Sequence, residues 1–165
     1  MSDELKAKTQ GSRLPHHPSS ITHHPRTGTV LAFDFGTKRI GVAVGDFETR
    51  LAHPLAVISA VENRARFAAI GRLVSEWRPA RLVVGVPTHA DGAEHAIGRL
   101  AHRFAQRLQG RFGVPVALVD ERLTSREAEA MLQAAGVRGA RFKAGVDSLA
   151  AQRMLESYFA GGELC

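Results

Sequence analysis

The sequence predicts an α/β fold in which a mixed five-stranded sheet carries helices on both faces. Three observations predict it. Two β-rich runs, Thr29–Phe35 and Ile40–Asp46, flank a short turn, as in an antiparallel hairpin. Helical periodicity begins only after a third β-rich run, and two apolar runs then alternate with helical segments, as buried parallel strands do. The first three strands should therefore form an antiparallel meander, to which crossover helices add two parallel strands.

The strands of the meander are bounded by residues that favour turns and edges. Gly36 lies in the hairpin turn, where its backbone can adopt angles closed to other residues. A third strand is expected over Leu51–Ser59. Pro54 lies inside this strand, and because proline donates no backbone hydrogen bond, it predicts a bulge or an edge position.

The first helix is expected over residues 62–77, where apolar side chains recur every three or four positions. Pro79 ends it, since proline cannot continue a helix. The core-facing stripe comprises Phe67, Ile70, Val74 and Trp77. Trp77, and Tyr158 on the stripe of the last helix, are therefore interpreted as packing residues and not as platforms for nucleic-acid bases.

Two further strands enclose the second helix. The apolar runs over residues 81–87 and 114–120 are typical of strands buried on both faces. The helix between them is expected over residues 91–109. Its predicted packing stripe comprises Ala93, Ile97, Leu100, Phe104 and Leu108.

Two helices close the chain. Thr124 and Glu127 form a capping box for the first of them, and Gly136 stops it. Its packing stripe comprises Ala128, Met131, Leu132 and Ala135. A basic loop over residues 137–145 then precedes a last helix, expected from about Asp147 to Phe159.

These elements predict one folded domain between two tails. Residues 1–28 are rich in Pro, Ser, His and Gly and lack apolar periodicity, so they should form a disordered N-terminal tail. Residues 29–160 carry every predicted element, and residues 161–165 form a short C-terminal tail. The order βββαβαβαα is that of the RNase H-like fold, and the halves of sugar-kinase-like ATPases share it.

The overall charge indicates a polyanionic partner. Lys and Arg outnumber Asp and Glu by 22 to 16, which gives a net charge of +6 and a pI near 10.4. Nucleic acid is favoured over a membrane because no basic amphipathic helix stands out. Cys165 is the only cysteine, which excludes a disulfide framework and a cysteine-based zinc site. A reducing compartment fits this usage, and without a signal-peptide-like apolar stretch the expected location is the cytoplasm.

Acidic residues occur at three places where an acid is costly. Asp34 ends the apolar first strand, where an ionised group needs a partner. Asp120 and Glu121 follow the fifth strand, at the sheet end where ligands bind, and strand alternation sends only one of them towards the cleft. Asp147 shares the apolar face of the last helix, which comprises Ala150, Ala151, Met154, Leu155 and Tyr158.

Such acids form a plausible site for a divalent metal. Mg²⁺ and Mn²⁺ prefer oxygen ligands, and a cation makes crowded carboxylates tolerable. Two-metal hydrolysis of a phosphodiester is the chemistry that such a site performs. The simpler interpretations stay open: Asp34 as a turn residue, Asp120 and Glu121 as a solvated pair, and Asp147 as a helix cap.

Basic residues fall in the segments beside these acids, where they are predicted to contact phosphates. They are Lys38, Arg39, Arg122, Arg126, Arg138, Arg141 and Lys143.

Four segments resemble, in order, the blocks of the YqgF family, whose members are described as Holliday junction resolvases and as pre-16S rRNA nucleases. They are "DFGTKRIGVAVGD" from Asp34, "LVVGVPTHADG" from Leu82, "VDERLTSREAEAML" from Val119 and "KAGVDSLAAQRML" from Lys143. The resemblance implies an RNase H-like nuclease domain over residues 29–160. It also implies that Asp34, Glu121 and Asp147 are catalytic and bind Mg²⁺ or Mn²⁺, so that Glu121 and not Asp120 faces the cleft.

The resemblance implies two substrates. One is the 5′ end of pre-16S rRNA, with ribosomal precursor particles as partners in ribosome biogenesis; the other is a four-way DNA junction. A sugar-kinase-like ATPase is excluded because its two domains need more than 165 residues. A non-catalytic nucleic-acid-binding module on the same fold stays open, as does the choice between monomer and homodimer.

Overall fold

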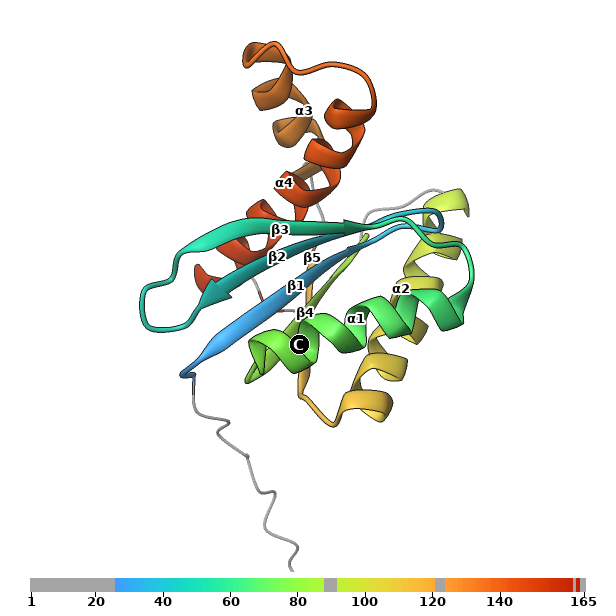
Figure 1. Ribbon diagram of the computed structural model, residues 1–165, viewed down its shortest axis with the longest axis vertical. Coiled ribbons are helices and arrows are strands. Elements are labelled where there is room, and N and C mark those ends of the chain that lie inside the picture. Colours follow the sequence, from blue (N-terminus) through green and yellow to red (C-terminus); the bar gives the residue numbers. More distant parts are fainter. Residues whose placement is uncertain (1–25, 88–91, 121–123, 162, 164–165) are drawn as a thin grey trace, which may run out of the picture.

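Five strands form one mixed sheet in the order β3-β2-β1-β4-β5 (Figure 1). The computed structural model describes residues 26–87, 92–120, 124–161 and 163, and for residues 92–95, 124–127 and 140 only the backbone. The strands are β1 (Thr29–Phe35), β2 (Ile40–Asp46), β3 (Ala52–Ile58), β4 (Arg81–Val86) and β5 (Val116–Asp120). The first three pair antiparallel, whereas β4 joins β1, and β5 joins β4, in parallel. The predicted meander with parallel additions is confirmed.

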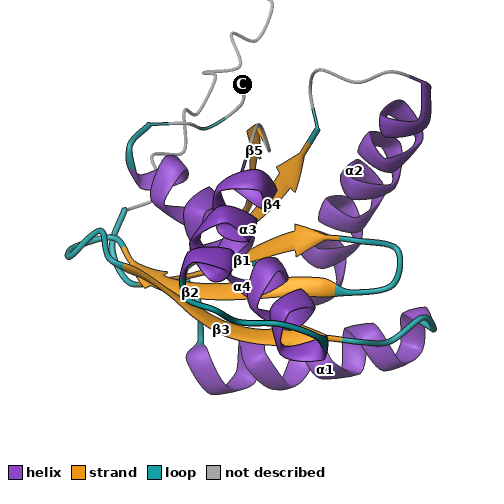
Figure 2. Cartoon of the chain, turned by 90° about the horizontal axis from the view of Figure 1, so that it is seen from above, coloured by secondary structure: helices purple, strands orange, loops and turns teal. Residues whose placement is uncertain are grey.

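Helices cover both faces of this sheet, as predicted (Figure 2). They are α1 (Asn63–Trp77), α2 (Gly92–Phe112), α3 (Thr124–Ala134) and α4 (Ala140–Phe159). α1 and α2 pack on one face and α4 on the other, while α3 and the start of α4 project beyond the sheet (Figure 1). None of the helices in the described part of the chain is long and apolar enough to cross a membrane.

The prediction for Pro54 is confirmed. β3 is an edge strand, and its pairing with β2 shifts by one residue between Val42, opposite Ala56, and Ala43, opposite Pro54. The bulge and the edge both spare the sheet the hydrogen bond that proline cannot donate.

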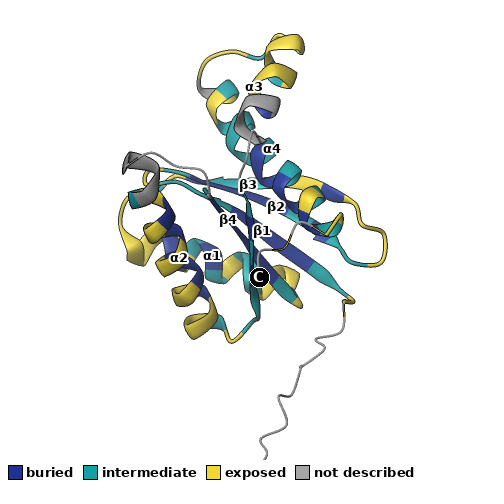
Figure 3. Cartoon of the chain, turned by 180° about the vertical axis from the view of Figure 1, so that it is seen from behind, coloured by how far each residue is buried: buried dark blue, intermediate teal, exposed yellow. Residues whose placement is uncertain are grey.

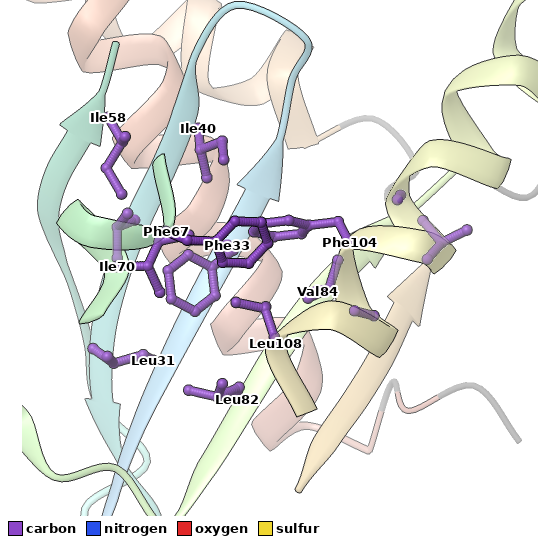
Figure 4. Close-up of a cluster of buried hydrophobic side chains, with 14 residues drawn as sticks. Leu31, Phe33, Ile40, Ile58, Phe67, Ile70, Leu82, Val84, Phe104 and Leu108 are labelled. Atoms are coloured by element: carbon purple, nitrogen blue, oxygen red, sulfur yellow. The ribbon is translucent and has the colours of Figure 1, made fainter. Parts of the chain in front are cut away.

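The two faces of the sheet hold different cores. On the α1–α2 face, aromatic rings interlock: the Phe104 ring lies 6.0 Å from that of Phe33 and 5.9 Å from that of Phe67 (Figure 4). On the α4 face the sheet offers small residues such as Ala32, Ala43 and Ala117. Because small side chains let backbones approach, α4 lies close against the strands.

Three predicted packing stripes, those of α1, α2 and α3, are partly wrong. Trp77 is exposed at the end of α1, although Tyr158 is buried as expected. Ile97 and Leu100 of α2 and Met131 of α3 are also exposed. In α2 the side chains that join Phe104 and Leu108 in the core are Ala101 and Ala105, because alanines let this helix lie close to β4 and β5.

The start of the last helix also differs from the prediction. Residues 137–145 were predicted to form a loop, but α4 begins at Ala140. Gly139, directly before it, has a φ of 72°, which turns the chain into the helix. Gly145, which suggests a loop in the sequence, is helical instead. Its missing side chain admits Leu132 of α3, whose Cδ1 would lie 3.0 Å from a Cβ at this position.

Candidate active site

Asp34 lies at the carboxyl end of β1, on the side of the sheet that faces α4. Val30 and Ala32 belong to the core beneath α4, and alternation along the strand gives Asp34 the same side. The residue is partly buried. Across the antiparallel ladder it pairs with Gly41 of β2, so a side chain on either residue would point to the same face.

Asp147 reaches the same place from α4. A Cβ built on Gly41 would lie 1.9 Å from the Asp147 carbonyl oxygen, so the α4 backbone occupies the space above Gly41. The five apolar residues predicted to share the face of Asp147 are all buried, which confirms that this face points at the sheet. The structure therefore brings Asp147 beside the residue paired with Asp34.

The other neighbour of Asp34 in the sheet also lacks a side chain. β1 and β4 pair with Phe33 opposite Val84, and the next residue of β4 along this register is Gly85. Residues two apart in a strand face the same side, so Gly85 lies on the side of Val83, which packs under α4. Glycine within a strand often marks a close approach by a ligand or another backbone. Here α4 lies on one side of Asp34, and its neighbour in β4 is a glycine.

The third predicted acid, Glu121, lies outside the described residues, and its role stays a prediction. The alternation of β5 can be followed up to Asp120: Ala117 and Val119 pack under α4, whereas Val116 and Leu118 pack on the opposite face. By the same alternation, Asp120 lies on the face of Val116 and Leu118, opposite α4. Among the described residues, no group of three or more His, Cys, Asp or Glu is placed to hold a metal.

A cation already lies against Asp147. The Arg39 Nε donates a hydrogen bond to the Asp147 Oδ2 at 2.6 Å, which makes a charge-assisted ion pair. The side chains are 40% and 22% exposed, so water screens part of the attraction. Arg39 comes from the β1–β2 turn, so the pair ties that turn to α4.

Arg66, which the sequence analysis did not single out, anchors the same turn from the other face. This α1 side chain is buried and donates hydrogen bonds to the carbonyl oxygens of Thr37 and Ala60. Its guanidinium lies 5.8 Å from the centre of the Phe35 ring. Burial lowers the pKa of Arg66 from its ordinary value. The signal in the sequence was an arginine one helical turn before Ile70, on the core-facing side of the helix.

The predicted phosphate-binding cations lie at different places. Lys38 is exposed in the β1–β2 turn, beside Arg39. Lys143 is exposed on α4 one turn before Asp147, on the same side of the helix, whereas Arg141 lies on another side. Arg138 is exposed in the connection before α4. Arg122 and the side chain of Arg126 lie outside the described residues.

Comparison with known proteins identifies close relatives in sequence. The model of the RuvX family, described as "Holliday junction resolvase", matches residues 28–161. A Dechloromonas aromatica protein named "Putative pre-16S rRNA nuclease" is 55% identical over 132 residues, which cover 80% of this chain and 90% of that protein. A protein of the same name from Methylobacillus flagellatus is 53% identical over 134 residues, covering 81% and 92%.

A solved structure supports the fold. The chain "T. thermophilus RuvC in complex with Holliday junction substrate" superposes with a TM-score of 0.52 at 17% identity, over 83% of this chain and 99% of that one. At this identity the likeness shows the fold alone. It confirms the RNase H-like α/β architecture that the order of elements predicted.

Proposed function

The chain belongs to the RuvX family, and from this premise we propose that it is a metal-dependent endonuclease acting on structured nucleic acid. The names of its relatives support pre-16S rRNA as its substrate, and the proposed reaction is processing of the 5′ end of this RNA in ribosome biogenesis. The observation that carries the proposal is the approach of α4 to β2. This approach sets Asp147 against Gly41, the partner of Asp34.

The residues at this site fit a divalent cation. Asp34 and Asp147 supply carboxylate oxygens, which Mg²⁺ and Mn²⁺ prefer, and Glu121 is the proposed third ligand. The contact of Arg39 with Asp147 supports this fit, because it shows that the carboxylate lies where a positive charge can reach it. When bound, Mg²⁺ or Mn²⁺ ions in a two-metal arrangement would activate the attacking water and stabilise the leaving oxygen.

The basic side chains around the site are proposed to hold the nucleic-acid backbone. Lys38 and Arg39 stand on a turn that Arg66 fixes to α1, so their backbone is held in place before substrate binds. Lys143 continues this surface along α4, next to Asp147. Phosphate contacts of this kind orient a strand without reading its bases. The outer contacts are proposed to come from Arg122, Arg126 and Arg141.

A four-way DNA junction is the second candidate substrate, which the description of the family model favours. The two substrates make different demands on assembly. One copy suffices to trim one RNA end, whereas symmetric cleavage of a junction calls for a homodimer. We further propose that residues 29–160 form the nuclease domain between the tails 1–28 and 161–165, and that it works in the cytoplasm on pre-rRNA or ribosomal precursor particles.

The test compares cleavage of a pre-16S 5′-leader RNA and a four-way DNA junction, each with Mn²⁺ and with EDTA. Wild type is expected to cut the RNA only with Mn²⁺, and Asp34→Asn and Asp147→Asn to lose at least about a hundredfold in rate, as for other catalytic groups. Asp46→Asn is the matched control. Asp46 ends β2 at the other end of the sheet and accepts hydrogen bonds from the backbone nitrogens of Glu48 and Thr49.

The other outcomes are informative. Cleavage that persists in EDTA or in Asp34→Asn contradicts the metal mechanism. Binding of both substrates without cleavage of either identifies a non-catalytic module. Cleavage of the junction alone selects the second candidate.

A further inference from the structure

Three arginines form a row along the solvent-facing side of α2, away from the candidate active site. Arg99, Arg103 and Arg107 recur every four residues, and all three are exposed. Figure 3 shows the exposed side of α2 in yellow. A helix rises about 1.5 Å per residue, so this arginine row is about 12 Å long. One turn further, the Arg111 guanidinium lies 4.3 Å from the centre of the Phe67 ring, which occupies it in packing between α2 and α1.

The arginine row lacks the acids that would neutralise it. The sequence contains no Asp or Glu from His95 to Val119. No ion pair involves the three arginines within the part of the chain that the structure describes. Like charges four residues apart destabilise a helix by about 0.2–0.5 kcal/mol per pair. The row therefore does not serve the stability of α2, and a partner outside the chain explains it better.

The arginine row begins at the same end of the sheet as the candidate active site. α2 follows β4, and β4 runs parallel to β1, whose carboxyl end carries Asp34. α2 then packs against β4 and the edge strand β5, on the face opposite α4. A polyanion held at Asp34 and Asp147 can thus continue past the β5 edge and follow α2.

We propose that the arginine row of Arg99, Arg103 and Arg107 is a second contact surface for the phosphate backbone of a nucleic-acid duplex flanking the cleavage site. The inference rests on the proposed function. A duplex advances about 3.4 Å per base pair, so the row spans roughly three to four base pairs. Arginine suits this role because its planar guanidinium matches phosphate oxygens with two parallel hydrogen bonds.

A second copy of the chain is a poorer occupant of the same surface. A symmetric interface across α2 would bring two arginine rows together without a described carboxylate to separate them. Such a juxtaposition of like charges opposes association. Charge complementarity therefore favours nucleic acid.

The test measures binding in EDTA, so that it does not depend on cleavage. A labelled pre-16S 5′-leader hairpin is titrated with wild type, with Arg103→Gln/Arg107→Gln and with the control Arg50→Gln/Arg78→Gln over a series of salt concentrations. The control removes the same charge from two exposed positions outside the arginine row. Glutamine is a good helix former, and circular dichroism checks that α2 stays folded.

The row variant is expected to weaken binding roughly 10- to 60-fold at 0.1 M salt, since two lost phosphate contacts remove about 1.8 from the slope of log K against log salt. The control should change the affinity and the salt slope much less. An equal effect of the control, or binding by the row variant like wild type, overturns the inference. The same proteins are also titrated with anionic vesicles. If the row variant loses binding to the vesicles but not to the RNA, the inference is overturned in favour of a membrane.

This binding test and the cleavage assay together separate this inference from the proposed function. If wild type binds no nucleic acid, both are overturned. If the row variant alone loses RNA binding while wild type never cleaves with Mn²⁺, the contact surface stands and the nuclease proposal is overturned.

Discussion

Gly41 holds the position on which the geometry of the candidate site depends, because its missing side chain is what lets α4 lie against β2. We predict that Gly41→Ala destabilises the protein by at least about 2 kcal/mol, since the new methyl group would meet the backbone of Asp147 and not a flexible side chain. The same variant should lose cleavage, because α4 must move away from Asp34. Urea unfolding and the RNA cleavage assay measure the two effects.

Gly110→Ala is the matched control for this prediction. A Cβ at Gly110, inside α2, would meet no atom within 4 Å, so this variant should gain about 0.5–1 kcal/mol of stability. Equal effects of the two substitutions would contradict the role assigned to Gly41.

Arg39 acts on Asp147 as a cation that a metal would have to replace or share. We predict that Arg39→Gln tightens Mn²⁺ binding about three- to tenfold in the absence of nucleic acid, because it removes a positive charge hydrogen-bonded to Asp147, the proposed ligand. Electron paramagnetic resonance of free Mn²⁺ measures this affinity without any cleavage. Lys38→Gln removes the same charge from the neighbouring position and should change it less; unchanged or weaker binding in Arg39→Gln would refute the prediction.

At the scale of elements, α1 supports the β1–β2 turn through the buried Arg66. We predict that Arg66→Met destabilises the protein by about 2–3 kcal/mol, because it leaves the carbonyl oxygens of Thr37 and Ala60 without their donor. Arg64→Met, on the exposed side of the same helix, should stay within about 0.5 kcal/mol of wild type. Similar losses in both variants would show that Arg66 has no special part in holding the turn.

α4 presents its two predicted phosphate contacts on different sides, which allows them to be separated. Lys143 lies one turn before Asp147 on the same side, and Arg141 does not. We predict that Lys143→Gln raises KM for the RNA at least about threefold more than Arg141→Gln does, with kcat little changed in both. Steady-state kinetics decides it, and a larger effect of Arg141→Gln would reverse the proposed path of the backbone along α4.

The strands were predictable from the sequence and the helix surfaces less so, for a physical reason. Strand alternation and turn glycines act locally, so Thr29–Phe35 and Ile40–Asp46 have the predicted bounds. The stripe of α2 depends on which small residues let the helix approach the sheet, and that is a property of the partner surface. Gly145 was wrongly predicted to lie in a loop for the same reason, because this glycine makes room for a side chain of α3 and does not form a turn.

For the site, the sequence indicated which acids to consider but not how they meet. Asp34 and Asp147 were predicted as site residues from their apolar surroundings. The close packing of α4 on Gly41 joins residues far apart in the sequence, so only the folded structure shows it. The role of Arg66 was not predicted, because its hydrogen-bond acceptors are backbone carbonyl oxygens, which every residue has and no sequence pattern identifies.

At the scale of the whole molecule, the two basic regions that we propose to contact nucleic acid lie on opposite faces of the sheet. One follows the β1–β2 turn and the start of α4, and the other follows α2. No basic amphipathic helix was predicted, yet the spacing of Arg99, Arg103 and Arg107 gives α2 a basic face. A nucleic acid that contacts both regions would wrap around the β5 edge of the sheet.

We propose that Asp34 and Asp147 belong to one divalent-metal site. It is tested most directly by the anomalous scattering of Mn²⁺ in crystals of the protein. We expect a Mn²⁺ ion with an oxygen of each carboxylate at roughly 2.1 Å, and Arg39 moved off Asp147. A crystal with Mn²⁺ bound elsewhere, and with Arg39 still paired to Asp147, would contradict it.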